Sequence, residues 1–224
     1  MTYEETMEFL KTHASPSRRK SMIKQGAPET TLGVTLGPVR KLAKTIGINH
    51  ELALQLWKSE VVDAQLLAVM LLDPKQISVV TAISMIGQAA YEPLQDDLMF
   101  RTLVAIPDYD LLKKELKADS RDAFQRAYWS MIVYEIGNDK MFDSARIEGI
   151  LETVEAELVA SPPQTQWMMN RALSEIGFRF SDYTQKCITI GETLGVYRDM
   201  KVAPGCTSAY APAWIEAVLN RKRK

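Results

Sequence analysis

The chain has 224 residues, of which 46% are hydrophobic and 25% are charged, and its formal net charge is −1. This balance is typical of a globular protein and argues against extensive disorder. Two cysteines, Cys187 and Cys206, form neither a disulfide framework nor a four-ligand metal set, so we expect a reducing, cytoplasmic environment. We expect no signal peptide, and the longest uncharged stretch, residues 76–91, is too short and too polar to span a membrane.

Basic residues gather near the N-terminus, between residues 17 and 44, where only Glu29 opposes them; residues 221–224 are basic too. Such clusters can follow the phosphates of a nucleic acid. We therefore predict DNA contacts for Arg18, Arg19, Lys20, Arg40, Lys41 and Lys44. The alternative is a solvated helix face, and a pI near 6.2 leaves a protein-interaction scaffold open.

Helical periodicity dominates the sequence. Apolar residues recur at helical spacing through residues 50–72, and Asp73-Pro74 closes that run. Clean alternating strands flanked by hairpin turns are missing from the pattern. Glycines are expected to mark helix ends at Gly26, Gly47, Gly137, Gly177 and Gly195. The pattern predicts an all-α chain of short helices.

The helices are expected to repeat. Glu135-Ile136-Gly137 and Glu175-Ile176-Gly177 match at an offset of forty residues, and the helix that starts near Asp63-Ala64 resembles the one that starts near Asp122-Ala123. A period near forty favours HEAT-like antiparallel helical repeats stacked into a curved superhelix, within a single domain over residues 1–224. A compact helical bundle is the alternative.

Several segments carry a family resemblance. They are residues 33–44 (GVTLGPVRKLAK), 50–57 (HELALQLW), 125–127 (QRA), 167–170 (WMMN) and 190–199 (IGETLGVYRD). Together they resemble the AlkD-like DNA alkylation-repair family of HEAT-like repeat glycosylases, over most of the chain. The C-terminal extension, residues 205–224 with Gly205-Cys206-Thr207-Ser208, is similar to one branch of these relatives.

The resemblance implies binding of double-stranded, alkylated or damaged DNA in a concave groove and removal of cationic N3- or N7-alkylated purines, with no cofactor, metal or membrane. Asp96 matches the family's catalytic aspartate, whose carboxylate favours the positive charge that develops on the sugar. Arg126 matches an arginine that contacts the DNA backbone near the catalytic centre. Both are therefore candidate catalytic residues.

The family's active-site tryptophans are replaced in this sequence. The first falls on Glu92, next to Tyr91, and the second falls on Arg171, one turn after Trp167. Tyr91, Trp167 and Arg171 are therefore candidate substrate-binding residues, and the lost aromatics favour a non-catalytic alternative that binds branched or damaged DNA, or a protein.

Each candidate also has a structural interpretation. Asp96 is alternatively a solvated or helix-capping acid, and Arg126 a partner of Asp122 one turn earlier. The four tryptophans are expected mostly in the core. His13 and His50 lack plausible ligand partners, and no downstream histidine stands ready to activate Cys206.

Overall fold

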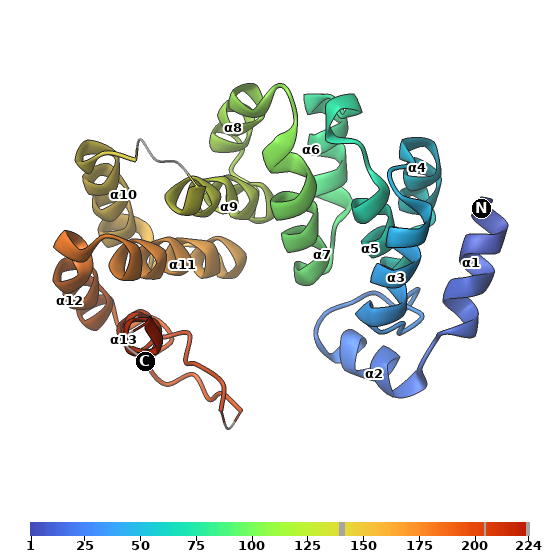
Figure 1. The fold of residues 1–224 in the computed structure, drawn as a ribbon. Coiled ribbons are helices and arrows are strands. Elements are labelled where there is room, and N and C mark those ends of the chain that lie inside the picture. Colours follow the sequence, from blue (N-terminus) through green and yellow to red (C-terminus); the bar gives the residue numbers. More distant parts are fainter. Residues whose placement is uncertain (139–141, 204, 223–224) are drawn as a thin grey trace. The chain divides into compact units, whose positions relative to one another are not determined.

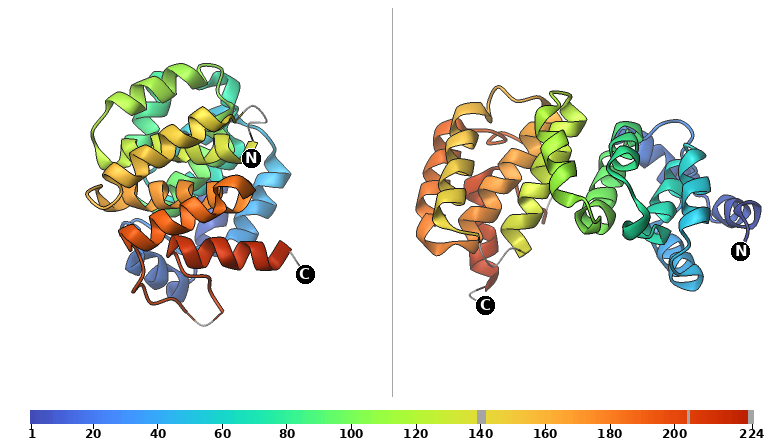
Figure 2. Two further views of the ribbon diagram at one scale, coloured as in Figure 1. Left: turned by 90° about the vertical axis from the view of Figure 1, so that its left-hand side faces the viewer. Right: turned by 90° about the horizontal axis from the view of Figure 1, so that it is seen from above.

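The structure is a computed structural model that describes residues 1–138, 142–203 and 205–222. Within these residues the chain forms α-helices joined mostly by short turns, with longer connections over residues 25–35 and 195–210, and the strand-like element is one isolated bridge between Ala14 and Val34. The all-α prediction is therefore confirmed. The chain divides into two compact units, residues 1–118 and residues 119–224 (Figures 1 and 2). The single domain expected from the sequence stays a prediction.

The first unit contains eight α-helices: α1 (Tyr3–Thr12), α2 (Pro16–Lys24), α3 (Leu36–Ile46), α4 (His50–Lys58), α5 (Val62–Leu71), α6 (Val79–Gln88), α7 (Glu92–Asp97) and α8 (Tyr109–Ala118). Helix α5 is its centre, because all of its residues except Met70 are buried. It packs against α3, α4 and α7. A helix that is apolar all round must be covered by neighbours on every side.

The described residues of the second unit form five α-helices: α9 (Asp122–Asn138), α10 (Ser144–Glu157), α11 (Pro163–Arg179), α12 (Thr184–Leu194) and α13 (Ala211–Lys222). Helices α9 and α11 lie side by side and share the largest helix contact of the described residues (Figure 1). Helix α11 also packs against α12 and α13, so it is the centre of this unit.

Side-chain caps explain where several helices begin. Thr2 forms a reciprocal capping box with Glu5 at α1, and Ser15, Asn49, Ser78 and Asp143 accept hydrogen bonds from first-turn amides of the helices that follow them. Such caps satisfy backbone N–H groups that have no partner inside the helix.

The forty-residue period is visible in the structure. Helices α9 and α11 are both 17 residues long and place Glu-Ile-Gly in their last turns. The similarity between the starts of α5 and α9 also has a structural meaning, because Asp63 and Asp122 both bind backbone amides of another segment. The predicted repetition of helical pairs is confirmed.

The glycines expected at helix ends divide into two groups. Gly47 and Gly195 are C-caps, and Gly26 follows the C-cap of α2, each with positive φ, as expected. Gly137 and Gly177 lie inside the last turns of α9 and α11, so the prediction was wrong there. At Gly177 the reason is packing, because a Cβ atom would lie 2.4 Å from Cδ1 of Ile215 in α13.

Candidate nucleic-acid interface

The basic cluster of the first unit lies on α2 and α3. Arg40, Lys41 and Lys44 are exposed on α3, whose sequence contains no acidic residue, and Lys20 is exposed on α2. Arg40 and Lys44 are one turn apart, so their side chains share one face of the helix. We call Lys20, Arg40, Lys41 and Lys44 the basic patch. Exposed lysine and arginine side chains of this kind contact phosphates in nucleic-acid-binding proteins.

Arg18 and Arg19, the remaining predicted DNA contacts, are less accessible. Arg18 is half-buried. The Arg19 guanidinium donates from Nε to the Thr31 carbonyl at 2.9 Å, and from Nη2 to both the carbonyl and the carboxylate of Glu29 at 2.7 Å. Arg19 therefore holds the loop between α2 and α3, and its DNA contact stays a prediction.

The Gly33-Val34 motif forms a small anion-binding turn that is already filled by a side chain. The carboxylate of Asp63, itself 0% exposed, accepts hydrogen bonds from the amides of Leu32 at 2.6 Å, Gly33 at 3.3 Å and Val34 at 2.7 Å. Successive backbone N–H groups that converge on one point form a concavity that binds anions. The Asp63 carboxylate occupies this turn, so the turn is not open to an external anion. Its role is structural: it fixes the segment that leads into α3 and thereby positions the basic residues of that helix.

Gly33 is required by space as well as by conformation. Its φ is +85°, and a Cβ atom would lie 2.4 Å from the backbone nitrogen of Arg19. The Ser15 amide donates to the Gly33 carbonyl at 3.1 Å, which brings the start of α2 against this turn. Only glycine combines a left-handed backbone with so close an approach. The motif thus joins α2 to the segment that leads into α3.

Asp96, the candidate catalytic aspartate, is half-buried in the last turn of α7. The helix passes directly into a π-helical turn (Leu98–Thr102) and then a 3₁₀ turn (Leu103–Ala105). Thr102 Oγ1 donates to the Val69 carbonyl at 3.2 Å and ties this segment to α5. The neighbouring Asp97 pairs with Arg101 at 2.9 Å. Helix α7 thus leads from Asp96 into an irregular turn, and such turns are frequent at functional sites.

Tyr91, a candidate substrate-binding residue, is the N-cap of α7 and is 2% exposed. Its hydroxyl donates to Oε1 of Gln25, just after α2, at 3.2 Å. Burial raises the pKa of the phenol above its ordinary value, and the nearby Arg18 acts in the opposite direction. The ring is thus part of the core of the first unit in this structure, and its contact with a substrate stays a prediction.

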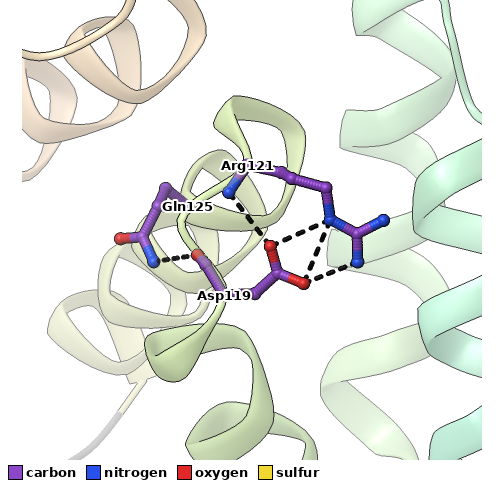
Figure 3. A network of polar contacts seen from close by, with 3 residues as sticks. All are labelled: Asp119, Arg121 and Gln125. Carbon is purple, nitrogen blue, oxygen red and sulfur yellow. Dashed lines mark hydrogen bonds and ion pairs between the residues drawn. The ribbon is translucent and has the colours of Figure 1, made fainter.

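Arg126, the second candidate catalytic residue, is 2% exposed in α9. A polar network holds the start of that helix (Figure 3): the Asp119 carboxylate accepts from the amide and the guanidinium of Arg121, and Gln125 Nε2 donates to the Asp119 carbonyl at 2.6 Å. The side-chain hydrogen bond from Arg121 lowers the pKa of Asp119. Asp122, the alternative partner expected for Arg126, accepts from the amides of Gln164 and Thr165 at the start of α11, and its pairing with Arg126 stays a prediction.

Trp167 and Arg171, the other candidate substrate-binding residues, lie one turn apart on α11. Trp167 is half-buried and meets the ring of Tyr197 edge to face, with 5.5 Å between the centroids. The Arg171 side chain is 29% exposed, and its Nε lies 3.7 Å from a carboxylate oxygen of Glu175. Both side chains reach the surface of the second unit. The expected core positions are confirmed for Trp57 and Trp129, each 4% exposed, whereas Trp214 is half-buried.

Sequence reasoning missed two kinds of residue. Asp63 and Asp122 stand out in the sequence only as parts of similar helix starts, although their carboxylates organise backbone amides in both units. Tyr197 falls within a family motif that assigns it no role, yet it packs against Trp167 with an unusual φ of +62°. A repeated aspartate at a helix start was the available signal for the first kind, and no local signal marked the second.

Metal sites and membrane spans are both absent from the described residues. Among these residues no group of three or more His, Cys, Asp or Glu side chains is placed to hold a metal ion. Across residues 1–138, 142–203 and 205–222, no helix has both the length and the apolar character needed to cross a membrane. Of the basic C-terminal residues, Arg223 and Lys224 lie outside the described part of the chain.

Comparison with known proteins places the chain in a family. The family model described as DNA alkylation repair enzyme matches residues 6–214. One solved structure is similar over 100% of this chain and 96% of its own, with a TM-score of 0.84 and 27% identity. It represents "a new family of proteins related to the HEAT-like repeat DNA glycosylases with affinity for branched DNA structures". No curated protein matches the sequence. The helical pairs are thus HEAT-like repeats, and the chain belongs to the DNA alkylation repair enzyme family.

Proposed function

We propose that this protein binds DNA, with branched DNA as its preferred form, and that the basic patch supplies phosphate contacts. The observation that carries the proposal is full-length similarity, at 27% identity and a TM-score of 0.84, to a protein family with affinity for branched DNA. The replaced aromatics support binding without base excision, because Glu92 and Arg171 stand where the resemblance places the family's tryptophans.

The charge distribution supports phosphate binding by the first unit. Lys20, Arg40, Lys41 and Lys44 are exposed, and neither α2 nor α3 contains an acidic residue. Lysine and arginine side chains that neutralise phosphates release condensed counterions, which makes the affinity fall as salt rises. A net charge of −1 for the whole chain means that this attraction is local to the patch.

Binding should be measured by fluorescence polarisation with a labelled three-way junction and a duplex of equal length, over a series of salt concentrations. The triple variant Arg40→Gln, Lys41→Gln, Lys44→Gln removes three charges while keeping long polar side chains. We expect weaker binding and a slope of log K against log salt that is shallower by about 2 to 3, because each phosphate that is no longer neutralised changes the slope by about 0.9.

The matched control removes three exposed lysines from separate helices of the same unit, Lys11, Lys58 and Lys114. Lys11→Gln, Lys58→Gln, Lys114→Gln changes the net charge equally, so it should keep the wild-type slope if the patch acts by position. Wild-type affinity and slope in the patch variant would remove the patch from the proposal. Failure of the wild-type protein to bind either DNA would refute DNA binding itself.

Removal of N3- or N7-alkylated purines is the second candidate function. It is favoured by the position of Asp96, which is half-buried two residues before the start of the π-helical turn. A carboxylate there would favour the positive charge that develops on the sugar as the glycosidic bond breaks. An Asp96→Asn variant keeps the size of the side chain and removes its charge. Asp97→Asn is the matched control, because it makes the same chemical change at the neighbouring carboxylate, which pairs with Arg101.

The two candidates are separated by release of 7-methylguanine and 3-methyladenine from methylated duplex DNA. The proposed non-catalytic function predicts no release by the wild-type protein at any enzyme concentration that saturates the DNA. Release by the wild type and by Asp97→Asn, with none by Asp96→Asn, would establish a glycosylase and identify its carboxylate together.

A further inference from the structure

We propose that Trp167 and Tyr197 form a stacking platform for one unpaired nucleobase at the branch point of DNA. The inference rests on the proposed function and names the part of branched DNA that the second unit recognises. It involves a surface distinct from the basic patch, which contacts phosphates in the first unit. The platform is built from one helix, α11, and from the segment between α12 and α13.

The two rings are held in a fixed arrangement at the surface. They meet edge to face, with 5.5 Å between centroids and 64° between ring planes, and both side chains are half-buried. Edge-to-face contact is a stable arrangement for an aromatic pair. Because each side chain is half-buried, part of the pair remains exposed to solvent.

Tyr197 is held in an uncommon backbone conformation. Its φ of +62° lies in the left-handed region, which a bulky residue rarely adopts. Such conformations persist where the surroundings fix them, and they are concentrated at functional sites. The preceding Gly195, the αL C-cap of α12, turns the chain toward this position.

The segment that carries Tyr197 is anchored at several points. Asn170 of α11 is buried and donates through Nδ2 to the Ala209 carbonyl at 2.8 Å. Arg198 donates to the Glu192 carbonyl, and its guanidinium lies 5.6 Å from the centroid of the Tyr210 ring. Arg221 Nη2 donates to Thr207 Oγ1 at 2.9 Å. In Figure 1 the segment extends from the helices of its unit between α12 and α13. The bonds hold it to α11, α12 and α13, so the platform is preorganised.

The charges beside the platform suit a nucleic acid. Arg171 follows Trp167 by one helical turn, and Arg198 follows Tyr197 directly. The exposed Asp199 comes next and is followed by the exposed Lys201, so cations outnumber acids in this segment. Glu175 faces Arg171 and also pairs with Arg179 at 2.6 Å. Aromatic surface combined with nearby arginines is the combination by which proteins hold single-stranded nucleic acid, with the base on the ring and the phosphate near the cation.

An exposed aromatic pair can stack on an unpaired base more readily than on a paired one. In an uninterrupted duplex both faces of an internal base are covered by its neighbours, so an aromatic side chain gains access only by unstacking them. At a branch point a base without a partner exposes its face. Base stacking on aromatic residues is also tolerant of sequence, because every base has a π-face. The platform therefore recognises the structure of the DNA and not its sequence.

The test uses a three-way junction with one unpaired 2-aminopurine at the branch point, and a fully paired duplex of equal length. The wild-type protein should quench 2-aminopurine fluorescence on binding, because stacking on an aromatic ring quenches it. Trp167→Ala should abolish the quenching and weaken junction binding about tenfold or more, with duplex binding unchanged. Trp167→Phe, which keeps an aromatic face, should retain most of the affinity.

Two further variants give controls. Tyr197→Gly removes the second ring at a position where glycine is comfortable at positive φ, and it should weaken junction binding in the same selective way. Tyr134→Ala removes a half-buried aromatic of α9 outside the platform and should leave both affinities unchanged. Circular dichroism confirms that each variant is helical. If Trp167→Ala is unfolded, the wild-type quenching and the Tyr197→Gly result decide the question.

The outcomes separate this inference from the proposed function. An equal loss of junction and duplex affinity in Trp167→Ala, or unchanged fluorescence when the wild type binds the junction, would overturn the platform and leave DNA binding standing. Absence of any DNA binding by the wild type would overturn both. Selective loss of junction binding together with loss of quenching establishes the platform.

Discussion

At the scale of single residues, two aspartates organise backbone amides far from them in sequence. Asp63 binds three successive amides of the turn before α3, about thirty positions earlier in the chain. Asp122 binds the first amides of α11, about forty positions later. A carboxylate that accepts several backbone hydrogen bonds satisfies donors that would otherwise be buried without partners. Both residues are thus structural, although an acidic side chain near a functional segment invites a catalytic interpretation.

Asp63→Ala should lower the free energy of unfolding by about 3 kcal/mol or more, because several buried amides lose their acceptor at once. Asp63→Asn keeps one acceptor oxygen and should cost less. Urea denaturation followed by circular dichroism measures both. Equal stability of Asp63→Ala and the wild type would show that the turn finds other acceptors. Because the turn positions α3, we also expect weaker DNA binding in the alanine variant.

The two cysteines should differ sharply in reactivity. Burial raises the pKa of Cys187 from 9.0 to about 12, whereas Cys206 is exposed. The thiolate is the reactive form, so at pH 8 a thiol reagent should modify one cysteine of the native protein and both in denaturant. Mass spectrometry after labelling gives the count. Modification of Cys187 in the folded protein would contradict its burial.

The same pKa shift has a defined effect on stability. Because the folded-state pKa of Cys187 is raised, its thiol favours the folded state fully below pH 9, and this contribution is lost as the pH rises from about 9 to about 12. The direction of this change follows from linkage: as the pH rises, the Cys187 thiol of the unfolded chain loses its proton before the thiol of the folded protein does. The difference in unfolding free energy between wild type and Cys187→Ala should shrink over that range.

At the scale of elements, glycines let α13 approach the helices beneath it. A Cβ atom on Gly177 of α11 would lie 2.4 Å from Ile215 Cδ1, and one on Gly191 of α12 would lie 2.7 Å from Pro212 Cδ. Ile215 is 0% exposed. Small residues at these two positions therefore set the separation of α13 from α11 and α12, and larger ones would force it away.

Gly177→Ala should destabilise the protein by about 1–3 kcal/mol, the usual cost of overpacking a core. Ile215→Ala alone should cost about 2–5 kcal/mol. Combined, the two changes should cost less than the sum of the single changes, because the new methyl group enters the space that the isoleucine leaves. A double-mutant cycle in urea measures this coupling.

Gly149→Ala in α10 is the matched control for this prediction. A Cβ atom added at Gly149 would have no neighbour within 4 Å, so alanine meets no clash there. Alanine is the better helix former, and the change should stabilise the protein by about 0.5–1 kcal/mol. Additive effects of Gly177→Ala and Ile215→Ala would contradict direct contact between α11 and α13.

At the scale of the whole molecule, the sequence predicted the class of fold and its repetition, because helical periodicity and a forty-residue period are local signals. It did not distinguish Gly177, which meets Ile215 in α13, from Gly195, which ends a helix, since both positions require glycine. The division into compact units, residues 1–118 and 119–224, is not a local signal of the sequence. It depends on contacts between distant segments, which periodicity does not encode.

The candidate site was predictable only in part for the same reason. Exposure of Arg40, Lys41 and Lys44 follows from the polar face of an amphipathic helix. Burial of Tyr91 and Arg126, and the engagement of Arg19 by Glu29 and Thr31, depend on tertiary contacts. Resemblance marks a position in the chain, and the surrounding helices decide whether its side chain is accessible.

Asp122→Ala should lower the free energy of unfolding by about 1–2 kcal/mol, the cost of losing a strong helix cap. The reason is that Asp122 Oδ1 accepts from the Thr165 amide at 2.8 Å and from its hydroxyl at 2.7 Å. Hydrogen exchange should show the loss in the first turn of α11, with α3–α5 amides retaining their protection. Unchanged exchange in α11 would show that Pro163 alone suffices to begin the helix.

The cap supplied by Asp122 also bears on how the protein assembles. Helix α11 begins with amides whose acceptor belongs to α9, so its first turn is complete only after the earlier helix has formed. During synthesis α9 leaves the ribosome first, and the residue that provides the cap is therefore in place before the helix that receives it. In a repeat protein such nearest-neighbour dependence makes order spread along the chain from one pair to the next.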